Sequence, residues 1–384
     1  MKGLQRLAVT CGGTGGHFYP GLAAAVAAEK RGVPVLLLLS GVNAAKQCAI
    51  AAEHGIRAVE LPRMPSPSSP GRLFAFGSGA IRGLLRARRE LRRFRPQAML
   101  GMGSFASAPA LLAARSCRIP YFLHDGNARI GRANRIFSRR GGVVAAAFPA
   151  VNADACRGRV IVTGMPLRAE LIAAAAEWDK AKAIARLNER FDASLLPGCF
   201  TVLVTGGSQG AAKLNEIVPR VLAEADPASL QVLHLAGRGK AEAARAAYGE
   251  SPVRRIVIES TSEMELFLAA ADLAFSRSGG STVAELALFG TPAVLVPYPY
   301  AAEGHQRDNA LFFTGHGGGV LIDNADLTAD AVRGALAKPP EFWREASRRA
   351  RELARPRAAE ELLDEIDAMV RGETPERFDL PPQE

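Results

Sequence analysis

The sequence lacks the long apolar segments that mark a membrane-spanning protein. None of its apolar runs reaches about 18 residues, the length at which a run indicates a transmembrane helix. Its first residues lead straight into a strand-like segment, without a signal peptide's apolar core or small-residue cleavage site. We therefore expect the chain to stay in the cytoplasm.

Cysteines are few, and they are scattered singly. The five are Cys11, Cys48, Cys117, Cys156 and Cys199. Because no CxxC spacing occurs, the pattern predicts neither a zinc site nor a disulfide framework. An odd number of cysteines in a chain without an export signal is typical of reduced thiols.

Aromatic residues make up only 6% of the chain, so platforms on which nucleic-acid bases stack are scarce. No nucleic-acid-binding motif is present either, and we expect no nucleic-acid partner. The net charge of +10 is unevenly distributed: residues 1–165 hold 24 basic and 6 acidic side chains, and residues 166–384 hold 24 and 32. The resulting split of +18 and −8 indicates an anionic partner for the first half.

Short, unalternated apolar runs recur along the whole chain, with helical patterns and glycine-rich turns between them. The runs are 7–10, 33–39, 98–101, 121–124, 143–146, 200–205, 231–235, 255–258, 273–275 and 293–296. Such runs predict parallel sheets covered on both faces. Each half opens with a strand, a glycine-rich turn and a helix, which predicts two doubly wound α/β domains facing a cleft. We place the domains at 1–163 and 164–340, with helices in 341–384 folding back on the first.

Residues 62–79 are rich in proline, serine and glycine and predict an irregular loop. The following segment, 81–95, carries seven arginines and one acid. A solvated helix face and a contact with an anionic membrane surface both explain this run, and each basic residue near such a surface contributes roughly 1 kcal/mol. The residues proposed for membrane contact are Leu73, Phe74, Phe76, Arg82, Arg86, Arg89 and Arg93.

Residues 12–17, Gly-Gly-Thr-Gly-Gly-His, join a strand to a helix. Glycines allow close approach of a ligand, and a helix N-terminus offers unpaired N–H groups to an anion. The segment lacks the Gly-Lys-Ser/Thr ending of a Walker loop and the spacing of the dinucleotide fingerprint. His17 suits general-base chemistry near neutral pH, although a histidine here also commonly caps or packs.

Two further glycine-rich turns lie in the second half, at 206–210 and 276–285. Ser208 adds a hydroxyl to the backbone donors of the first of them. The helix that follows the second can receive a pyrophosphate at its start, and Glu285, one turn in, can accept both hydroxyls of a ribose. The segment 281–285 is also consistent with a helix-capping box.

Together these segments resemble the MurG family, which transfers N-acetylglucosamine from UDP-GlcNAc to the undecaprenyl-pyrophosphoryl-MurNAc-pentapeptide called lipid I. Matching segments run from about residue 6 to residue 325, and include 101–109, 124–127, 163–168 and 305–310. The resemblance implies a GT-B fold, with two Rossmann-like domains and the donor mainly in the C-terminal one. It also implies lipid II as product and a role in cell-wall biogenesis, cell shape and cell division.

The resemblance implies roles for individual residues. His17 and Asn127 would be catalytic. The donor would be bound by Thr14, Gly15, Gly16, His17, Asn127, Arg168, Ser208, Thr261, Ser281, Thr282, Glu285, His305 and Gln306. The acceptor diphosphate would lie at Gly13, Thr14, Gly103, Ser104 and Phe105. The chain departs from the family's usual pattern at Ser104, Asp125 and Gly126, which stand for Gly, Glu and Gln, and at Ser260-Thr261, where an aromatic–aliphatic pair usually flanks the uracil.

An inverting transfer needs one base, for which His17 is the candidate, and no DxD-like acid pair lies beside the loops. We therefore expect no obligatory metal and no cofactor. Expected partners are lipid I, the anionic inner face of the cell membrane, where the protein would be peripheral, and other cell-wall enzymes. Two alternatives remain: a related transferase with a diacylglycerol-type acceptor, and a non-catalytic sugar-nucleotide-binding scaffold.

Overall fold

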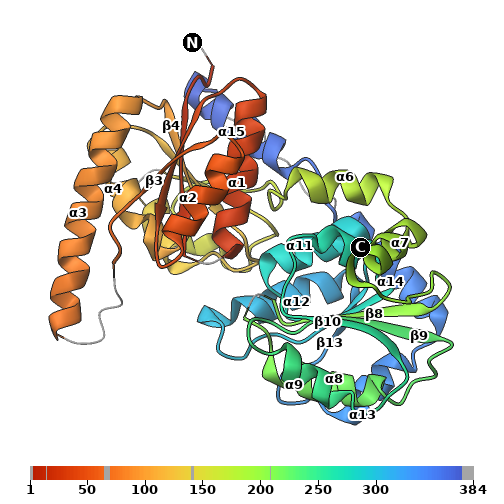
Figure 1. Cartoon of the computed structure of the whole chain (residues 1–384). Coiled ribbons are helices and arrows are strands. Elements are labelled where there is room, and N and C mark those ends of the chain that lie inside the picture. The colour runs from red at the N-terminus through yellow and green to blue at the C-terminus, as the bar shows by residue number, and fades with distance from the viewer. Residues whose placement is uncertain (1–2, 14, 65–69, 140–141, 208, 374–384) are drawn as a thin grey trace. The chain divides into compact units, whose positions relative to one another are not determined.

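Figure 1 shows the computed structural model of the chain, coloured from the N-terminus to the C-terminus. The structure describes residues 3–13, 15–64, 70–139, 142–207 and 209–373, and the side chains of residues 70–75 lie outside that description. The chain divides into two compact units, one formed by Met1–Arg168 with Pro356–Glu384 and the other by Ala169–Arg355. Each unit is a parallel sheet flanked by helices.

In the described part of the first unit, seven parallel strands form one sheet in the order β3-β2-β1-β4-β5-β6-β7. The strands are β1 (Leu7–Gly12), β2 (Val35–Ser40), β3 (Arg57–Glu60), β4 (Ala98–Gly101), β5 (Tyr121–Asp125), β6 (Val143–Ala146) and β7 (Val160–Val162). The helices are α1 (Gly15–Lys30), α2 (Ala44–Glu53), α3 (Pro70–Phe94), α4 (Ala108–Ser116), α5 (Arg132–Ser138) and α15 (Ala358–Arg371), with 3-10 turns at Phe105–Ser107 and Ala153–Ala155. The strand order reverses between β1 and β4, and ligands of such sheets bind beyond the carboxyl ends at this point.

The first unit's core lies on both faces of this sheet. Leu7 of β1 packs in one cluster with Leu22 of α1 and Ile366 of α15. Its neighbour Ala8 faces the other side, in a cluster with Leu91 of α3. Successive strand side chains point to opposite faces, so a strand covered on both sides requires the continuous apolar run that the sequence shows.

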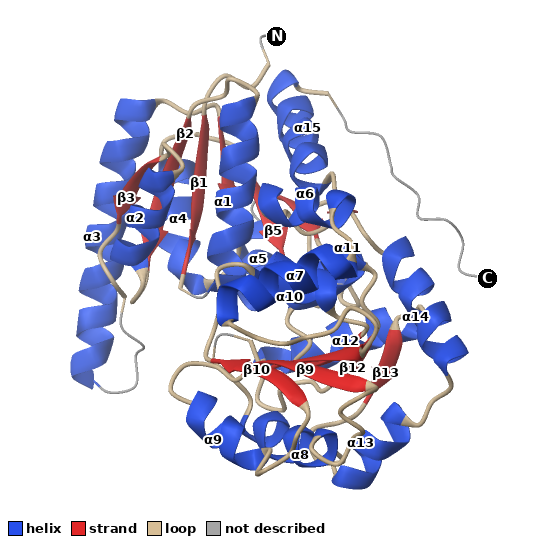
Figure 2. Ribbon diagram, turned by 45° about the vertical axis from the view of Figure 1, so that its right-hand side comes forward, coloured by secondary structure: helices blue, strands red, loops and turns tan. Residues whose placement is uncertain are grey.

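In the described part of the second unit, six parallel strands follow the order β10-β9-β8-β11-β12-β13 (Figure 2). The strands are β8 (Phe200–Thr205), β9 (Leu230–Leu235), β10 (Arg254–Ile258), β11 (Leu273–Ser276), β12 (Ala293–Leu295) and β13 (Gly319–Leu321). The helices are α6 (Ala169–Glu177), α7 (Lys180–Phe191), α8 (Ala212–Leu222), α9 (Ala241–Ala247), α10 (Met264–Ala270), α11 (Gly280–Phe289), α12 (His305–Gly315), α13 (Ala329–Leu336) and α14 (Pro340–Glu352), with a 3-10 turn at Ala302–Gly304. The order reverses between β8 and β11. All ten predicted apolar runs form strands of the two sheets, as expected.

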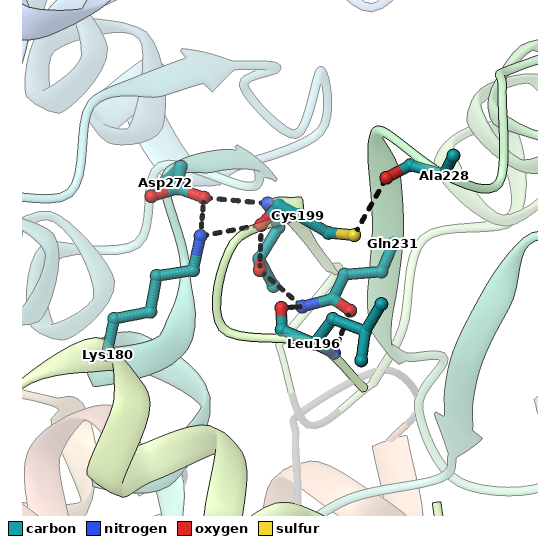
Figure 3. Close-up of polar contacts among 7 residues, drawn as sticks. Lys180, Leu196, Cys199, Ala228, Gln231 and Asp272 are labelled. Atoms are coloured by element: carbon teal, nitrogen blue, oxygen red, sulfur yellow. Dashed lines mark hydrogen bonds and ion pairs between the residues drawn. The ribbon is translucent and has the colours of Figure 1, made fainter. Parts of the chain in front are cut away.

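A polar cluster closes the amino ends of β8, β9 and β11 (Figure 3). Lys180 forms an ion pair with Asp272 and donates to the Cys199 carbonyl at 2.6 Å. The Asp272 carboxylate also accepts from the Thr201 amide at 2.7 Å, and the buried Gln231 amide donates to the Thr201 hydroxyl at 2.9 Å. These bonds join α7 to the amino ends of three strands. The polar side chains of the cluster therefore serve as hydrogen-bond partners for one another.

The unit boundaries differ from the predicted domains. The first unit extends to Arg168 instead of residue 163. Helix α14, which we expected to return to the first domain, packs against α11 and β13 of the second unit, and Trp343 is part of that unit's core. Helix α15 does pack on α1. The division therefore falls between these two helices.

The prediction of an irregular loop over 62–79 is wrong for its second half, because α3 begins at Pro70. Proline is favoured at the first position of a helix, since its missing N–H has no partner there. Gly79 and Gly83 serve close packing: a Cβ on Gly79 would lie 2.5 Å from the Arg63 carbonyl oxygen, and one on Gly83 would lie 3.3 Å from Pro109. The glycines that indicated a loop allow other segments to approach the helix.

Candidate active site

The first glycine-rich turn is held against the neighbouring strand by backbone contacts. Gly12 has a φ of +136°, and a Cβ there would lie 2.3 Å from the Ser40 carbonyl oxygen, so no other residue fits. The Gly13 amide donates to that same oxygen at 3.0 Å. Thr14 lies outside the described residues. His17 is the third residue of α1 and is half-buried, close to a helix N-terminus, the part of a helix that favours an anion.

The turn after β4 lies beside His17. A Cβ on Gly103 would be 3.5 Å from the Cδ2 of His17. Ser104 follows with a φ of +65° and a ψ of 145°, a backbone region that is essentially restricted to glycine, and its hydroxyl accepts from the Ala106 amide at 3.3 Å. Phe105 is 54% exposed. The predicted acceptor-diphosphate residues Gly13, Gly103 and Ser104 therefore lie just beyond the carboxyl ends of two paired strands, β1 and β4.

Asp125, at the end of β5, is the centre of a hydrogen-bonded loop. One carboxylate oxygen accepts from the Asn127 amide at 3.2 Å and from its side-chain nitrogen at 3.4 Å. The other accepts from the Gly131 amide at 2.8 Å and from Asn134 at 3.0 Å. Burial raises the pKa of this carboxyl group, and the hydrogen bonds from Gly131, Asn134 and Asn127 oppose that rise. The shorter acid at this position therefore still reaches Asn127.

His124, the preceding residue, is fully buried and neutral at pH 7. Burial lowers its pKa to about 4, a bond to the Gly164 carbonyl opposes the shift, and the nearby His17 lowers the pKa further. Its Nε2 lies 2.9 Å from the Gly164 oxygen. Because a carbonyl only accepts, Nε2 carries the proton. The imidazole thus fixes the segment that leaves the first unit, and the proximity places His17 near the end of β5.

In the second unit, the turn between β8 and α8 is packed on the loop after β9. Gly210 has a φ of +65°, and a Cβ there would lie 2.1 Å from the Ala236 carbonyl oxygen. The Gly207 amide donates to the Thr205 hydroxyl at 3.3 Å. Ser208 lies outside the described residues. The turn lies at the carboxyl end of β8, next to the point where the strand order reverses.

The third glycine-rich turn leads from β11 into α11. Helix α11 starts at Gly280 with Gly279 as its N-cap, and no side chain caps it. Ser281 is therefore inside the first turn, and the predicted capping box is wrong. Ser281, Thr282 and Glu285 are all half-buried. The first turn of α11 thus carries two hydroxyl side chains, with a carboxylate one turn further, and a helix start of this kind can bind an anionic group.

Hydrogen bonds tie this turn to the start of α12. The buried Ser278 hydroxyl donates to the Gln306 carbonyl at 2.7 Å, and the Asn309 side chain donates to the Ser278 carbonyl at 2.9 Å. The Gln306 side-chain oxygen accepts from the Tyr298 amide at 2.9 Å. Its amide nitrogen is therefore the end that can donate to a ligand.

Two other predicted donor residues are placed by local turns. His305 begins α12, and its Nδ1 donates to the Ala302 carbonyl at 2.8 Å, which directs the other ring nitrogen outward from that turn. Thr261 follows β10, and its hydroxyl accepts from the Glu263 amide at 2.9 Å. Both residues lie beyond the carboxyl ends of strands of the same sheet.

Arg277 was not predicted as a site residue, although it lies within the third glycine-rich turn. Its guanidinium donates to the carbonyls of Val296 and Pro297 at 2.9 and 3.0 Å, and lies 5.7 Å from the centre of the Tyr298 ring. Burial lowers its pKa, but a guanidinium stays charged in proteins. The structure therefore places a half-buried positive charge beside the segment that follows β12. An arginine between a strand end and a glycine-rich helix start was the sequence signal.

Comparisons with known proteins show the family to which the chain belongs. Residues 7–145 match the glycosyltransferase family 28 N-terminal domain, and residues 201–362 match the family's C-terminal domain. A relative from Rhodospirillum centenum, a UDP-N-acetylglucosamine--N-acetylmuramyl-(pentapeptide) pyrophosphoryl-undecaprenol N-acetylglucosamine transferase, is 35% identical over 94% of this chain and 93% of its own. A relative of the same name from Streptomyces coelicolor is 36% identical over 92% and 94%. The chain belongs to the MurG family.

The crystal structure of Acinetobacter baumannii MurG resembles the chain with a TM-score of 0.73 and 26% identity, covering 94% of this chain and 99% of that one. The predicted fold class, an α/β GT-B fold of two Rossmann-like units, is therefore confirmed. The predicted MurG residues divide between the units. Six predicted donor residues and all the predicted acceptor residues belong to the first unit; these donor residues are Thr14, Gly15, Gly16, His17, Asn127 and Arg168. The remaining predicted donor residues belong to the second unit, and they are Ser208, Thr261, Ser281, Thr282, Glu285, His305 and Gln306.

The arginine-rich segment forms the exposed face of α3. Arg82, Arg86, Arg89 and Arg93, four of the residues proposed for membrane contact, are exposed. Two apolar side chains that we did not predict, Ile81 and Leu85, are 63% and 56% exposed on the same helix. Phe76 is half-buried, and the side chains of Leu73 and Phe74 lie outside the description. This face combines charge with apolar surface.

Two kinds of feature are absent from the described residues 3–13, 15–64, 70–139, 142–207 and 209–373. Across those ranges, no three or more His, Cys, Asp or Glu side chains are grouped so as to hold a metal ion. Within the same ranges, no helix is both long and apolar enough to span a membrane.

Proposed function

We propose that the protein transfers N-acetylglucosamine from UDP-GlcNAc to the C4 hydroxyl of MurNAc in lipid I, with inversion, forming lipid II. The observation that carries the proposal is full-length similarity to transferases with this named activity, in a chain that has both halves of the expected site. Its role would then be in peptidoglycan synthesis, and so in cell shape and division.

The donor half of the proposed site is the carboxyl edge of the second sheet. The Thr261 backbone would hold the uracil, and Glu285 would accept the two ribose hydroxyls. The amides at the start of α11, with Ser281, Thr282 and Ser208, would surround the diphosphate, and His305 and Gln306 would reach the sugar. The bonds from Ser278 and Asn309 support this arrangement, because they fix α12 to the turn before α11.

The acceptor half is the carboxyl edge of the first sheet. His17 would take the proton from the C4 hydroxyl as that oxygen bonds to the anomeric carbon and the bond to the diphosphate breaks. A single displacement of this kind inverts the anomeric centre. Asn127, held by Asp125, would contact the reacting sugar. The acceptor diphosphate would lie at Gly13, Thr14, Gly103, Ser104 and Phe105. The proximity of Gly103 to His17 supports this placement, since a Cβ on Gly103 would lie 3.5 Å from the His17 Cδ2.

We propose that no metal is needed for departure of UDP. The leaving diphosphate gains negative charge, which the start of α11 and the side chains of Arg168 and Arg277 would stabilise. Turnover that persists in excess EDTA is the expected result, and complete loss that added Mg²⁺ restores would overturn this part of the proposal.

We propose that the α3 face rests on the cytoplasmic surface of the membrane, where the lipid acceptor lies. The first unit holds 28 basic and 15 acidic residues, a net charge of +13, and this favours anionic headgroups. The protein would then be peripheral on the inner face, in reach of other cell-wall enzymes.

Product analysis tests the function. Purified protein is given labelled UDP-GlcNAc with lipid I or, in a parallel reaction, with diacylglycerol. The expected product is lipid II alone. A glycosylated diacylglycerol would show that diacylglycerol, and not lipid I, is the acceptor. Binding of UDP-GlcNAc without turnover on either lipid would favour a non-catalytic sugar-nucleotide-binding scaffold.

A further inference from the structure

The segment that leaves the first unit is attached to that unit along its length. The Thr163 amide donates to the Ala146 carbonyl at 3.1 Å, and His124 holds the Gly164 carbonyl at 2.9 Å. Met165 is buried, and its methyl group lies 2.8 Å from where a Cβ on Gly126 would be. The glycine at this position, a departure from the family's usual pattern, therefore makes room for the linker methionine.

The last residue of this segment, Arg168, stacks on an aromatic ring of α1. Its guanidinium carbon lies 5.5 Å from the centre of the Tyr19 ring. That ring is 42% exposed, touches the buried Phe18 at 5.3 Å between ring centres, and lies 3.5 Å from where a Cβ on Gly15 would be. Gly15 and Phe18 thus fix the ring, and the ring presents a face to the guanidinium.

We infer that Tyr19 is a positioning residue, which holds the Arg168 guanidinium beside the helix start that carries His17. The inference rests on the proposed function, in which Arg168 stabilises the donor diphosphate. Tyr19 is two residues from His17 on α1. One rigid turn of helix would therefore fix both the base, His17, and the Arg168 guanidinium that would stabilise the leaving diphosphate. The His17 imidazole and the Arg168 guanidinium would then keep a constant distance from each other within the first unit.

The ring, and not the phenol hydroxyl, is the group that this role requires, because a cation over a ring face is attracted by the π-system. Tyr19→Ala should therefore raise the KM for UDP-GlcNAc about two- to five-fold, the range that corresponds to the roughly 0.5–1 kcal/mol of an exposed cation–π contact. Tyr19→Phe should keep the wild-type KM. The KM for lipid I should change in neither variant.

A double-mutant cycle with Arg168→Ala separates positioning from a general structural role. If Tyr19 acts through Arg168, then Tyr19→Ala should have no further effect on the KM for UDP-GlcNAc once Arg168 is alanine. Additive effects of the two substitutions would overturn the inference, as would a wild-type KM in Tyr19→Ala. The thermal midpoints of all variants are measured alongside, and an equal loss of stability in Tyr19→Ala and Tyr19→Phe would assign Tyr19 to folding.

Trp178→Ala is the matched control. Lys182 lies 5.2 Å from the centre of the Trp178 ring, so this substitution removes a similar cation–aromatic pair from the second unit, and the KM should not change. The inference and the proposed function fail in different ways. An Arg168→Ala variant with wild-type kinetics contradicts the proposed donor site, whereas a strong Arg168→Ala effect without any Tyr19→Ala effect contradicts only the role of Tyr19.

Discussion

The two units share one architecture but differ in their net charge. The first holds 28 basic and 15 acidic residues, and the second holds 20 and 23, which gives +13 and −3. This split is smaller than the +18 and −8 of the two sequence halves, because the acidic α15 belongs to the first unit. Its acids are used for attachment: Asp364 pairs with Arg31 at 2.6 Å, and the Asp367 carboxylate accepts from the Leu4 amide at 2.5 Å. These two contacts of α15 are with Arg31 and Leu4, and neither involves an arginine of α3.

Each unit also buries one neutral histidine, with different results. His124 of the first unit holds the linker, as described above. In the second unit, the Asn215 side-chain nitrogen donates to the Ala236 carbonyl at 2.8 Å, so its oxygen accepts from Nε2 of His234 at 3.1 Å. The other ring nitrogen then accepts from the Tyr248 hydroxyl at 3.1 Å. This chain of bonds ends at the Ala236 carbonyl, against which Gly210 packs. His234 therefore supports the glycine-rich turn between β8 and α8.

The largest expected effects come from one substitution in each unit, and the two substitutions should change different kinetic parameters. His17→Ala should lower kcat by about 10²–10⁴-fold, the usual contribution of a positioned base, and leave the KM for UDP-GlcNAc within about three-fold. Glu285→Gln should instead raise that KM by about ten-fold or more, because it removes a charged hydrogen-bond acceptor. Steady-state kinetics with lipid I measures both. A large kcat effect from Glu285→Gln with an unchanged KM would break the division between acceptor and donor units.

Acid should destabilise both units through their buried histidines. Burial lowers the pKa of each to about 4 from an unfolded value near 6.5, so the unfolded chain binds more protons between these values, and stability falls as the pH falls through this window. From pH 7 to pH 5 the loss should be about 2 kcal/mol for each histidine.

Fluorescence can assign this acid effect, because both tryptophans, Trp178 and Trp343, lie in the second unit. In urea unfolding, the tryptophan signal should lose its pH dependence in His234→Gln and keep it in His124→Gln. Circular dichroism follows the whole chain. If the free energy of unfolding of His234→Gln kept the wild-type dependence on pH, His234 would not be the cause of the acid destabilisation.

Asp125→Asn should lower turnover about ten-fold, because an amide cannot accept from Gly131, Asn134 and Asn127 together, and the geometry of Asn127 is lost. Asp272→Asn is the matched variant in the second unit, where a carboxylate also accepts a backbone amide but at the amino ends of the strands. It should lower stability and leave the kinetics unchanged. Equal kinetic losses in the two would show that turnover follows stability alone.

The smallest effect concerns the charge difference itself. Arg89→Ala on the exposed face of α3 should weaken binding to anionic vesicles about five-fold, from roughly 1 kcal/mol per basic residue, and the effect should vanish in high salt. Arg344→Ala, on the exposed face of α14 in the second unit, is the control, because Arg344 pairs with Glu341. Sedimentation with phosphatidylglycerol vesicles measures both. Equal losses would mean that net charge, and not the α3 face, determines binding.

Sequence patterns predicted the interior strands because burial on both faces demands uninterrupted apolar runs. The edge strands β3, β7 and β13 were missed, since they have only three or four residues and are half-exposed or exposed. The start of α3 was missed because glycines that serve packing resemble glycines of a loop. Asp125, Arg277 and Tyr19 were not predicted as functional, because their roles depend on contacts with residues such as Asn134, Val296 and Arg168, which lie elsewhere in the sequence.

The return of α15 to the first unit determines the order in which the protein can fold during translation. Domains generally fold as they leave the ribosome, N-terminal first. Here Leu362, Leu363 and Ile366 fill part of the first unit's core, and they are synthesised after the whole of Ala169–Arg355. The second unit can therefore complete its core while the first still exposes the apolar side of α1. A nascent chain stalled before residue 358 would present that surface to chaperones.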